Sequence, residues 1–126
     1  MAIPEVKTTA VARKPWGETR CVHRDMTHEV WHASIRKGGY SSRHTHDRKA
    51  NLFYVSSGTL LVHVYNNSFS TIPSTTYKLE KGEQISIDDG VWHQFEAATD
   101  VELVEVYWVY LRGEDIRRAD EGGVKQ

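Results

Sequence analysis

Residues 38–58 read GGYSSRHTHDRKANLFYVSSG, and residues 82–93 read GEQISIDDGVWH. The first stretch holds two histidines, His44 and His46, separated by one residue, and the second ends in His93. Side chains alternate faces along a β-strand, so residues two apart point the same way and both imidazoles of the pair can face one interior. A third histidine from another strand would complete three nitrogen ligands and leave coordination positions open, as in catalytic metal sites. The sequence therefore predicts a metal site.

The periodicity around these stretches is that of β-strands, and no segment of ten or more residues shows a helical repeat. Glycine-bearing turns, such as those ending at Gly58, Gly82 and Gly90, let successive strands reverse at short intervals. Such regular turns predict an all-β fold, a jelly roll or barrel. The predicted strands cover residues 19–23, 29–36, 42–46, 52–56, 59–65, 75–79, 84–87, 91–97 and 101–111.

The composition predicts one domain. The chain has 126 residues, of which 39% are hydrophobic and 26% charged, enough for one core and too few for two. We assign residues 1–126 to a single domain with a core of about 14–118, a short N-terminal arm and a C-terminal tail. The net charge of -1, without a basic run, argues against a nucleic-acid partner.

The chain is also expected to be cytoplasmic. Its first residues lack the apolar region of a signal peptide, and the longest apolar run, 106–111, is too short to span a membrane. A single cysteine, Cys21, excludes an internal disulfide.

The pattern Gly-(x5)-His-x-His-(x4)-Asn-(x6)-Gly, followed by Gly-(x5)-Asp-Asp-Gly-(x2)-His, resembles the two motifs of the cupin superfamily. Within it, the chain is most similar to the C-terminal domain of type II mannose-6-phosphate isomerases. Further similarity covers KPWG at 14–17, ANLFYVSSGT at 50–59, VELVEV at 101–106 and GEDIRR at 113–118. The resemblance implies a jelly-roll, or double-stranded β-helix, barrel with a metal ion held by the motif histidines.

One departure from this pattern bears on the metal. Asn51 stands where the resemblance implies a glutamate ligand, so the site offers neutral imidazoles and at most a neutral amide oxygen. Hard ions such as Mn²⁺ and Mg²⁺ lose their preferred ligand, whereas Zn²⁺, Ni²⁺, Cu²⁺ and Fe²⁺ are affected less. The predicted cofactor is a divalent ion, one of Zn, Ni, Fe, Cu or Mn. The alternative is that the histidines line a pocket that no longer binds metal.

Two further residues are candidates for chemistry. Glu105 interrupts a last strand whose two faces are otherwise apolar. On the inner face burial would raise its pKa and suit a general base; on the outer face it would form an ion pair at an interface, the interpretation we favour. Lys49 occupies a position that is basic in the isomerase-like pattern and could meet a sugar phosphate, although an exposed loop lysine is the simpler interpretation. We expect Arg43 to point away from the histidines, and His23, His28, His32 and His63 to have no role in the site.

Two classes of function fit these residues. In the first, the chain is a metal-dependent sugar-phosphate isomerase, in which a pocket base moves a proton between C2 and C1 through an enediol. A three-histidine oxygenase using Fe²⁺ is a variant of this enzyme class. In the second class, the barrel binds a sugar or other small molecule without turning it over.

The last predicted strand also suggests a homodimer. Trp108 and Tyr110 fall on one face, and Tyr107 and Val109 on the other, so one small barrel cannot bury them all in its interior. A second copy of the chain is the expected cover for the outer face. The alternative is an N-terminal segment, including Trp16, folded across it.

Overall fold

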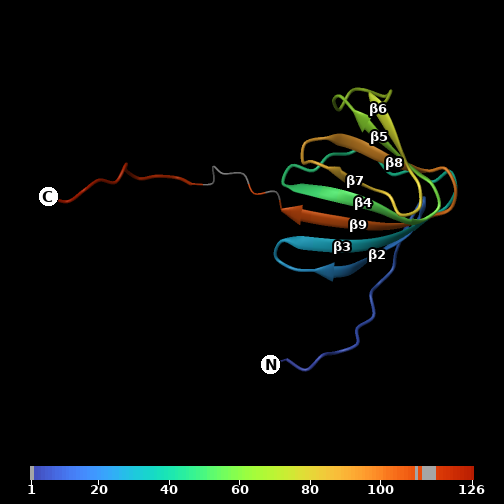
Figure 1. Ribbon diagram of the computed structural model, residues 1–126, viewed down its shortest axis with the longest axis horizontal. Coiled ribbons are helices and arrows are strands. Elements are labelled where there is room, and N and C mark those ends of the chain that lie inside the picture. Colours follow the sequence, from blue (N-terminus) through green and yellow to red (C-terminus); the bar gives the residue numbers. More distant parts are fainter. Residues whose placement is uncertain (1, 110, 112–115) are drawn as a thin grey trace.

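The computed structural model describes residues 2–109, 111 and 116–126. Its β-strands are β1 (Ala12–Lys14), β2 (Gly17–Arg24), β3 (His28–Ile35), β4 (Lys49–Ser57), β5 (Leu60–Tyr65), β6 (Thr75–Leu79), β7 (Gln84–Ile87), β8 (Trp92–Ala97) and β9 (Val101–Val109). They form two antiparallel sheets, ordered β1-β2-β3-β9-β4-β7 and β6-β5-β8 (Figure 1). The predicted all-β jelly-roll fold is confirmed. Among the described residues there is no helix of the length and hydropathy that a membrane span requires.

Several strand boundaries differ from the prediction, most of them by one or two residues. Residues 42–46 form no strand, because they touch β8 only through an isolated bridge between His44 and His93. Strand β4 begins at Lys49, earlier than predicted, and β1 has no counterpart in the prediction. The last strand ends by Leu111, which lies outside any strand, while Tyr110 and the motif residues 113–115 lie outside the described part of the chain.

Strand β9 lies in the middle of the larger sheet, between β3 and β4, and its alternation decides which side chains are inside. Val101, Leu103 and Glu105 are buried on the inner face, where the core lies between the two sheets. The core also takes apolar residues from both sheets, including Phe53, Val55, Leu60, Val62 and Phe95.

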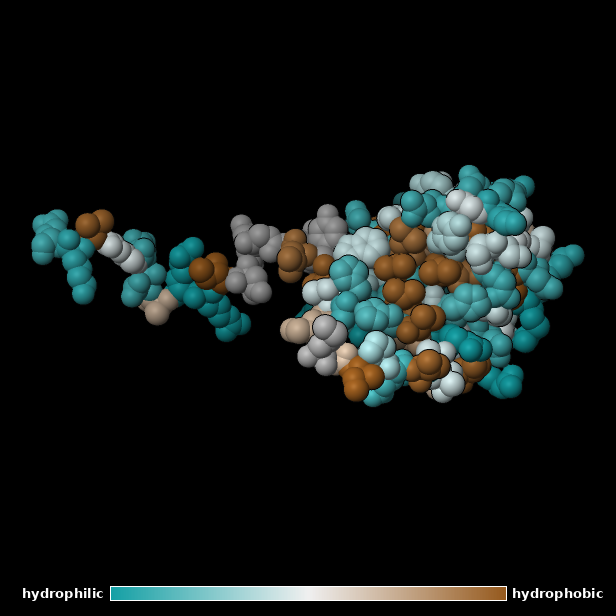
Figure 2. All heavy atoms as spheres, turned by 60° about the horizontal axis from the view of Figure 1, so that its bottom comes forward, coloured by the Kyte–Doolittle hydropathy of each residue, from teal (hydrophilic) through white to brown (hydrophobic). Residues whose placement is uncertain are grey.

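The opposite face of the larger sheet is partly apolar. Val30 on β3, Val106 on β9 and Leu52 on β4 are register neighbours in one row across three strands, and all are partly exposed. In Figure 2 the molecule is turned so that the lower edge of Figure 1, with β2 and β3, comes forward. Apolar side chains gather on the face that this view shows. Trp16 does not cover this face, because it packs against the core with its ring centroid 5.1 Å from that of Phe95. The alternative, in which the N-terminal segment folds Trp16 across the outer face, is therefore wrong for Trp16.

The homodimer stays a prediction. With Trp16 inside, we expect a second copy of the chain to cover the row of Val30, Val106 and Leu52, because burying apolar surface drives association. Sedimentation equilibrium at micromolar concentration should give a mass near twice the 14.5 kDa of one chain. A mass near 14.5 kDa would end the dimer proposal.

Candidate metal centre

The segment that carries His44 and His46 is held in place by its backbone. The amide of His44 donates to the carbonyl of His93 over 3.0 Å, and the amide of His93 donates back over 2.9 Å. The amide of Gly90, in the turn before β8, donates to the carbonyl of His46 over 2.8 Å. These bonds fix an irregular segment against β8, so the His-x-His pair reaches the third histidine without forming a strand of its own.

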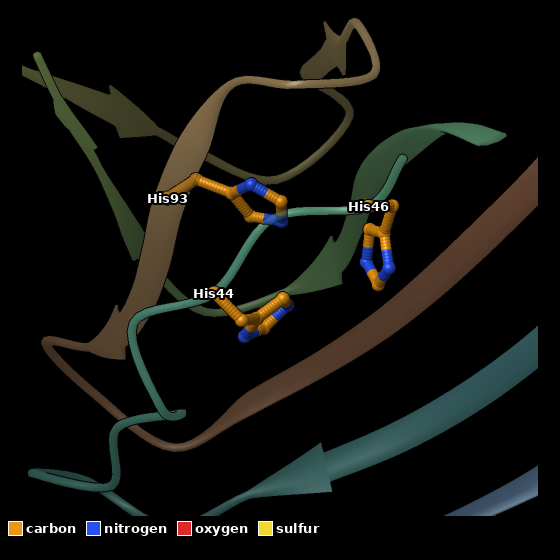
Figure 3. Close-up of side chains that lie close together, drawn as sticks. All are labelled: His44, His46 and His93. Atoms are coloured by element: carbon orange, nitrogen blue, oxygen red, sulfur yellow. The ribbon is translucent and has the colours of Figure 1, made fainter. Parts of the chain in front are cut away.

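The three imidazoles converge. Each of them offers a ring nitrogen, and these nitrogens all lie within 4.8 Å of one another. The ring centroids of His44 and His93 are 4.6 Å apart, and those of His44 and His46 are 5.1 Å apart. Figure 3 shows the three rings turned toward one shared space. The structure thus brings together the histidines that the sequence singled out.

Hydrogen bonds orient two of the rings. The Nδ1 of His93 lies 2.8 Å from the carbonyl oxygen of Val91, and the Nδ1 of His44 lies 2.9 Å from that of Ser42. A carbonyl oxygen only accepts, so each Nδ1 carries the proton and each Nε2 keeps a lone pair. Metal-binding histidines commonly show this arrangement, in which the second nitrogen fixes the tautomer and the ring orientation.

Several polar atoms at this place have no protein partner. The Nε2 atoms of His46 and His93 are buried and form no hydrogen bond within the described chain. Buried polar atoms in folded proteins are nearly always bonded, and leaving one unsatisfied costs about 1–3 kcal/mol. The unpartnered nitrogens therefore fit a metal ion in the space between them.

The histidines are in the form that binds metal. Burial lowers the pKa of His46 and of His93 to about 4, and burial also lowers the pKa of His44. The positive charge of Lys49 lowers the pKa of His44 and His46 further. At neutral pH the three rings are therefore uncharged and need not lose a second proton to act as ligands.

Asn51 points inward from β4, next to Tyr107 on β9 and Ile87 on β7 in the sheet register. It is 1% exposed, and neither its Oδ1 nor its Nδ2 finds a partner among the described residues. A buried amide with both ends unsatisfied is suited to hold an ion or a ligand molecule. Its service as a fourth metal ligand stays a prediction.

We expect Asn51→Glu to raise the affinity for Mn²⁺ by about tenfold or more, because it adds the anionic oxygen that hard ions prefer. Titration with Mn²⁺, followed by the electron paramagnetic resonance of the free ion, measures this. The matched control is Asn66→Glu, an exposed position in the loop after β5, which should leave Mn²⁺ binding unchanged. Equal or weaker Mn²⁺ binding by Asn51→Glu would count against Asn51 as a ligand position.

Glu105 faces the interior, so our favoured placement on the outer face is wrong. It shares the inner face of β9 with Leu103, and both are buried because this face closes the core. Burial raises the pKa of its carboxyl group, while the hydroxyl of Tyr107, donating over 2.5 Å, and the charge of Lys49 oppose the rise. Burial and the neighbouring Glu105 also raise the pKa of Tyr107, which keeps its proton.

A cavity of about 940 Å³ opens beside the histidines. His44, Lys49, Glu105 and Tyr107 line it, together with aromatic residues that include Trp16, Trp31 and Phe53. Lys49 is therefore part of the cavity wall at the start of β4 and not an exposed loop residue. The role of Tyr107 was missed by sequence reasoning, although its alternation with Glu105 on β9 was the available signal.

The remaining candidates lie apart from this cluster or are engaged elsewhere. Arg43 lines the cavity, but its guanidinium donates to the carbonyl of Ser70 and lies 5.4 Å from the ring centroid of Tyr65. The other histidines have partners away from the metal centre. His23 and His28 contact Asp25, His32 contacts Glu102, and His63 lies between Thr76 and Glu96.

Comparison with known proteins agrees with this geometry. The family described as Cupin domain matches residues 31–110, which include the three histidines and Asn51. No curated protein sequence matches the chain.

Many solved structures share the fold. KdgF from Halomonas sp. superposes with a TM-score of 0.67 at 15% identity, over 85% of this chain and 89% of that one. An RmlC-like cupin from Shewanella frigidimarina gives 0.65 at 18% identity, over 83% and 86%. A variant of oxalate decarboxylase from Bacillus subtilis gives 0.69 at 17% identity, over 80% of this chain but only 27% of the larger enzyme. At these identities the likeness concerns the fold alone.

Proposed function

The chain belongs to the cupin domain family, and from this premise we propose that it is a metal-dependent cupin that binds a small, oxygen-rich molecule in its barrel. His44, His46 and His93 would hold the ion, with Asn51 beside them. When bound, the ion would supply Lewis acidity toward a carbonyl or hydroxyl oxygen of the ligand. A related fold in oxalate decarboxylase from Bacillus subtilis carries Mn(II) centres, which supports the proposal of a divalent ion here.

One observation carries the proposal: three neutral imidazoles converge, and two of them, His46 and His93, have buried Nε2 atoms without a partner in the described chain. If these rings had only a packing role, their buried nitrogens without hydrogen bonds would lower the stability of the fold, and nothing would compensate for that loss. The protein's own contribution is orientation. Val91 and Ser42 hold the rings of His93 and His44 in the tautomer that leaves Nε2 free, and His93 is buried between the sheets.

The experiment is elemental analysis of the protein purified without added metal and without a nickel column. We expect about one equivalent of a transition metal per chain in the wild type and less than about a tenth in the double variant His44→Ala/His46→Ala. His23→Ala, at an exposed histidine, should keep the wild-type content. Wild-type protein that contains no metal and takes up none on addition of Zn²⁺ would refute the proposal.

A second candidate function is isomerisation of a sugar phosphate. The observation that favours it is the position of Glu105, a buried carboxyl group in the wall of the cavity that His44 also lines. Deprotonated Glu105 could take a proton from the carbon next to a carbonyl and return it to the neighbouring carbon, as the interconversion of aldose and ketose requires. Lys49, in the same wall, is placed to meet an anionic group of such a ligand.

Solvent exchange tests this candidate. In D₂O, metal-loaded protein should introduce deuterium next to the carbonyl of fructose 6-phosphate, as followed by proton NMR. Glu105→Gln should lower the rate by about 100-fold or more, because the amide removes the base, while the metal content stays at the wild-type level. Absence of exchange in wild-type protein that retains its metal would exclude this candidate and leave the metal-binding proposal intact.

A further inference from the structure

The metal centre brings no negative charge to an ion. The imidazoles of His44, His46 and His93 can offer nitrogen lone pairs but no negative charge, and Asn51 is a neutral amide. Within the described chain, the group of potential ligand residues at this place contains no aspartate, glutamate or cysteine. A divalent ion held here therefore keeps its two positive charges, in surroundings where charge is costly to leave uncompensated.

The ammonium group of Lys49 adds to this positive charge. The Nζ of Lys49 lies 4.4 Å from the ring centroid of Tyr107, whose ring in turn packs on His46 with centroids 5.5 Å apart. Lys49 contacts Glu29 over 3.4 Å, but Arg24 holds the same carboxylate over 2.5 Å. Two cations therefore share the carboxylate of Glu29, so this carboxylate does not fully neutralise Lys49.

Other charged groups of the cavity wall do not offset this charge at the metal. Lys14 and Arg43 are positive. Glu29 is committed to Arg24 and Lys49. Glu105 is buried, and its carboxyl group accepts a hydrogen bond from the hydroxyl of Tyr107. Three cationic side chains against two carboxyl groups give the cavity an excess of positive charge, between walls that are otherwise largely apolar and aromatic.

We propose that this centre is an anion receptor whose ligand is a small carboxylate, bound to the ion through an anionic oxygen with its charge facing Lys49. The inference rests on the proposed metal-binding function and adds the class of ligand to it. A carboxylate fits better than a phosphate because phosphate sites commonly use guanidinium forks or clustered backbone amides. Here Lys49 is a single ammonium group, and the guanidinium of Arg43 is engaged by Ser70 and Tyr65.

On this inference Asn51 determines specificity. An acidic residue at this position would supply one of the missing negative charges and would compete with the ligand for the ion. The neutral amide of Asn51 leaves the ion's charge to be balanced by the ligand. The same amide that lowers the affinity for hard ions therefore favours an anionic ligand over a neutral one.

The test uses Co²⁺-loaded protein, because the visible absorption of Co²⁺ reports changes in its coordination. Lactate is the probe, and lactamide is its neutral counterpart of nearly the same shape. We expect lactate to change the Co²⁺ spectrum with a dissociation constant at least tenfold below that of lactamide, and protein without metal to bind lactate at least tenfold more weakly by calorimetry. Inorganic phosphate should be the weaker anion.

Two variants probe the charges separately. Asn51→Asp should keep Co²⁺ and bind lactate at least tenfold more weakly, and Lys49→Gln should weaken lactate by about tenfold, or about 1.4 kcal/mol. Lys78→Gln, an exposed lysine on β6 paired with Glu80, is the control and should bind lactate as the wild type does. Because the buried carboxylate of Asn51→Asp could impair folding, Lys49→Gln provides an independent measurement.

The outcomes separate the two proposals. Wild-type protein that cannot be loaded with Co²⁺ would refute the metal site and the anion receptor together. Protein that holds Co²⁺ but binds lactate and lactamide equally, or binds phosphate more tightly than lactate, would overturn the carboxylate inference alone. Unchanged lactate binding in folded Asn51→Asp and Lys49→Gln would overturn it as well.

Discussion

His93→Ala is expected to lower the affinity for Zn²⁺ by more than about 100-fold, since even the loss of a group that only orients a ligand costs 10–100-fold. His93 is 1% exposed, its Nδ1 donates to Val91, and its unpartnered Nε2 faces the other two rings. The variant removes one of three converging nitrogens and leaves a cavity behind β8. Competition with a chromophoric chelator measures the affinity.

The matched control is His63→Ala on the neighbouring strand β5. His63 is also largely buried, and it bonds to Thr76 and Glu96, so its loss should lower stability without changing the Zn²⁺ affinity. Thermal unfolding of both variants without metal shows whether each is folded during the titration. If folded His93→Ala binds Zn²⁺ as the wild type does, the ion is not held by this cluster.

Gly58→Ala is expected to destabilise the protein by more than about 3 kcal/mol, a large share of the stability of a small domain. Gly58 has a φ of 87°, and a Cβ atom there would lie 2.0 Å from the carbonyl oxygen of Asp100 and 2.8 Å from the Oγ1 of Thr99. Alanine at this position would be strained in two ways. Its backbone would have to adopt a left-handed conformation, and its Cβ would collide with main-chain atoms that cannot move aside. Urea unfolding of the protein without metal gives the difference in free energy.

Gly82→Ala separates these two causes. Gly82 has nearly the same φ, 86°, but nothing lies within 4 Å of its Cβ position. Gly82→Ala should therefore lower the free energy of unfolding only by the cost of the left-handed backbone, about 1–2 kcal/mol. Equal losses in the two variants would mean that the turn at Gly58 relaxes away from Asp100.

The candidate site was predictable where local spacing decides. His44 and His46 are two positions apart, which favours a common direction, and Lys49 and Asn51 have the same spacing and share a face of β4. These relations need no knowledge of the rest of the fold. The meeting of the pair with His93 was predictable only because the second motif matched as well.

Sequence reasoning was less successful where both faces of a strand are apolar. On β9 the alternation separates Glu105 and Tyr107 from Val106 and Trp108, but it does not say which set is inside. Burial settles this: Leu103 and Glu105 are inside, so the carboxyl group lines the cavity. The segment 42–46 likewise has the alternation of a strand, yet it pairs with β8 through one bridge at His44.

The sequence by itself thus determined the all-β fold, the turns and the set of histidines, because period-two alternation, glycine at turns and residue spacing are local properties of the chain. Only the tertiary structure decided that Glu105 and Lys49 share a cavity with His44, and that Trp16 packs against Phe95. It also decided that Arg24 and Lys49 share the carboxylate of Glu29. Those relations join β2, β3, β4 and β9, whose pairing depends on how two sheets close over one core. Contacts between residues so far apart in the chain follow from this packing and are absent from any local pattern.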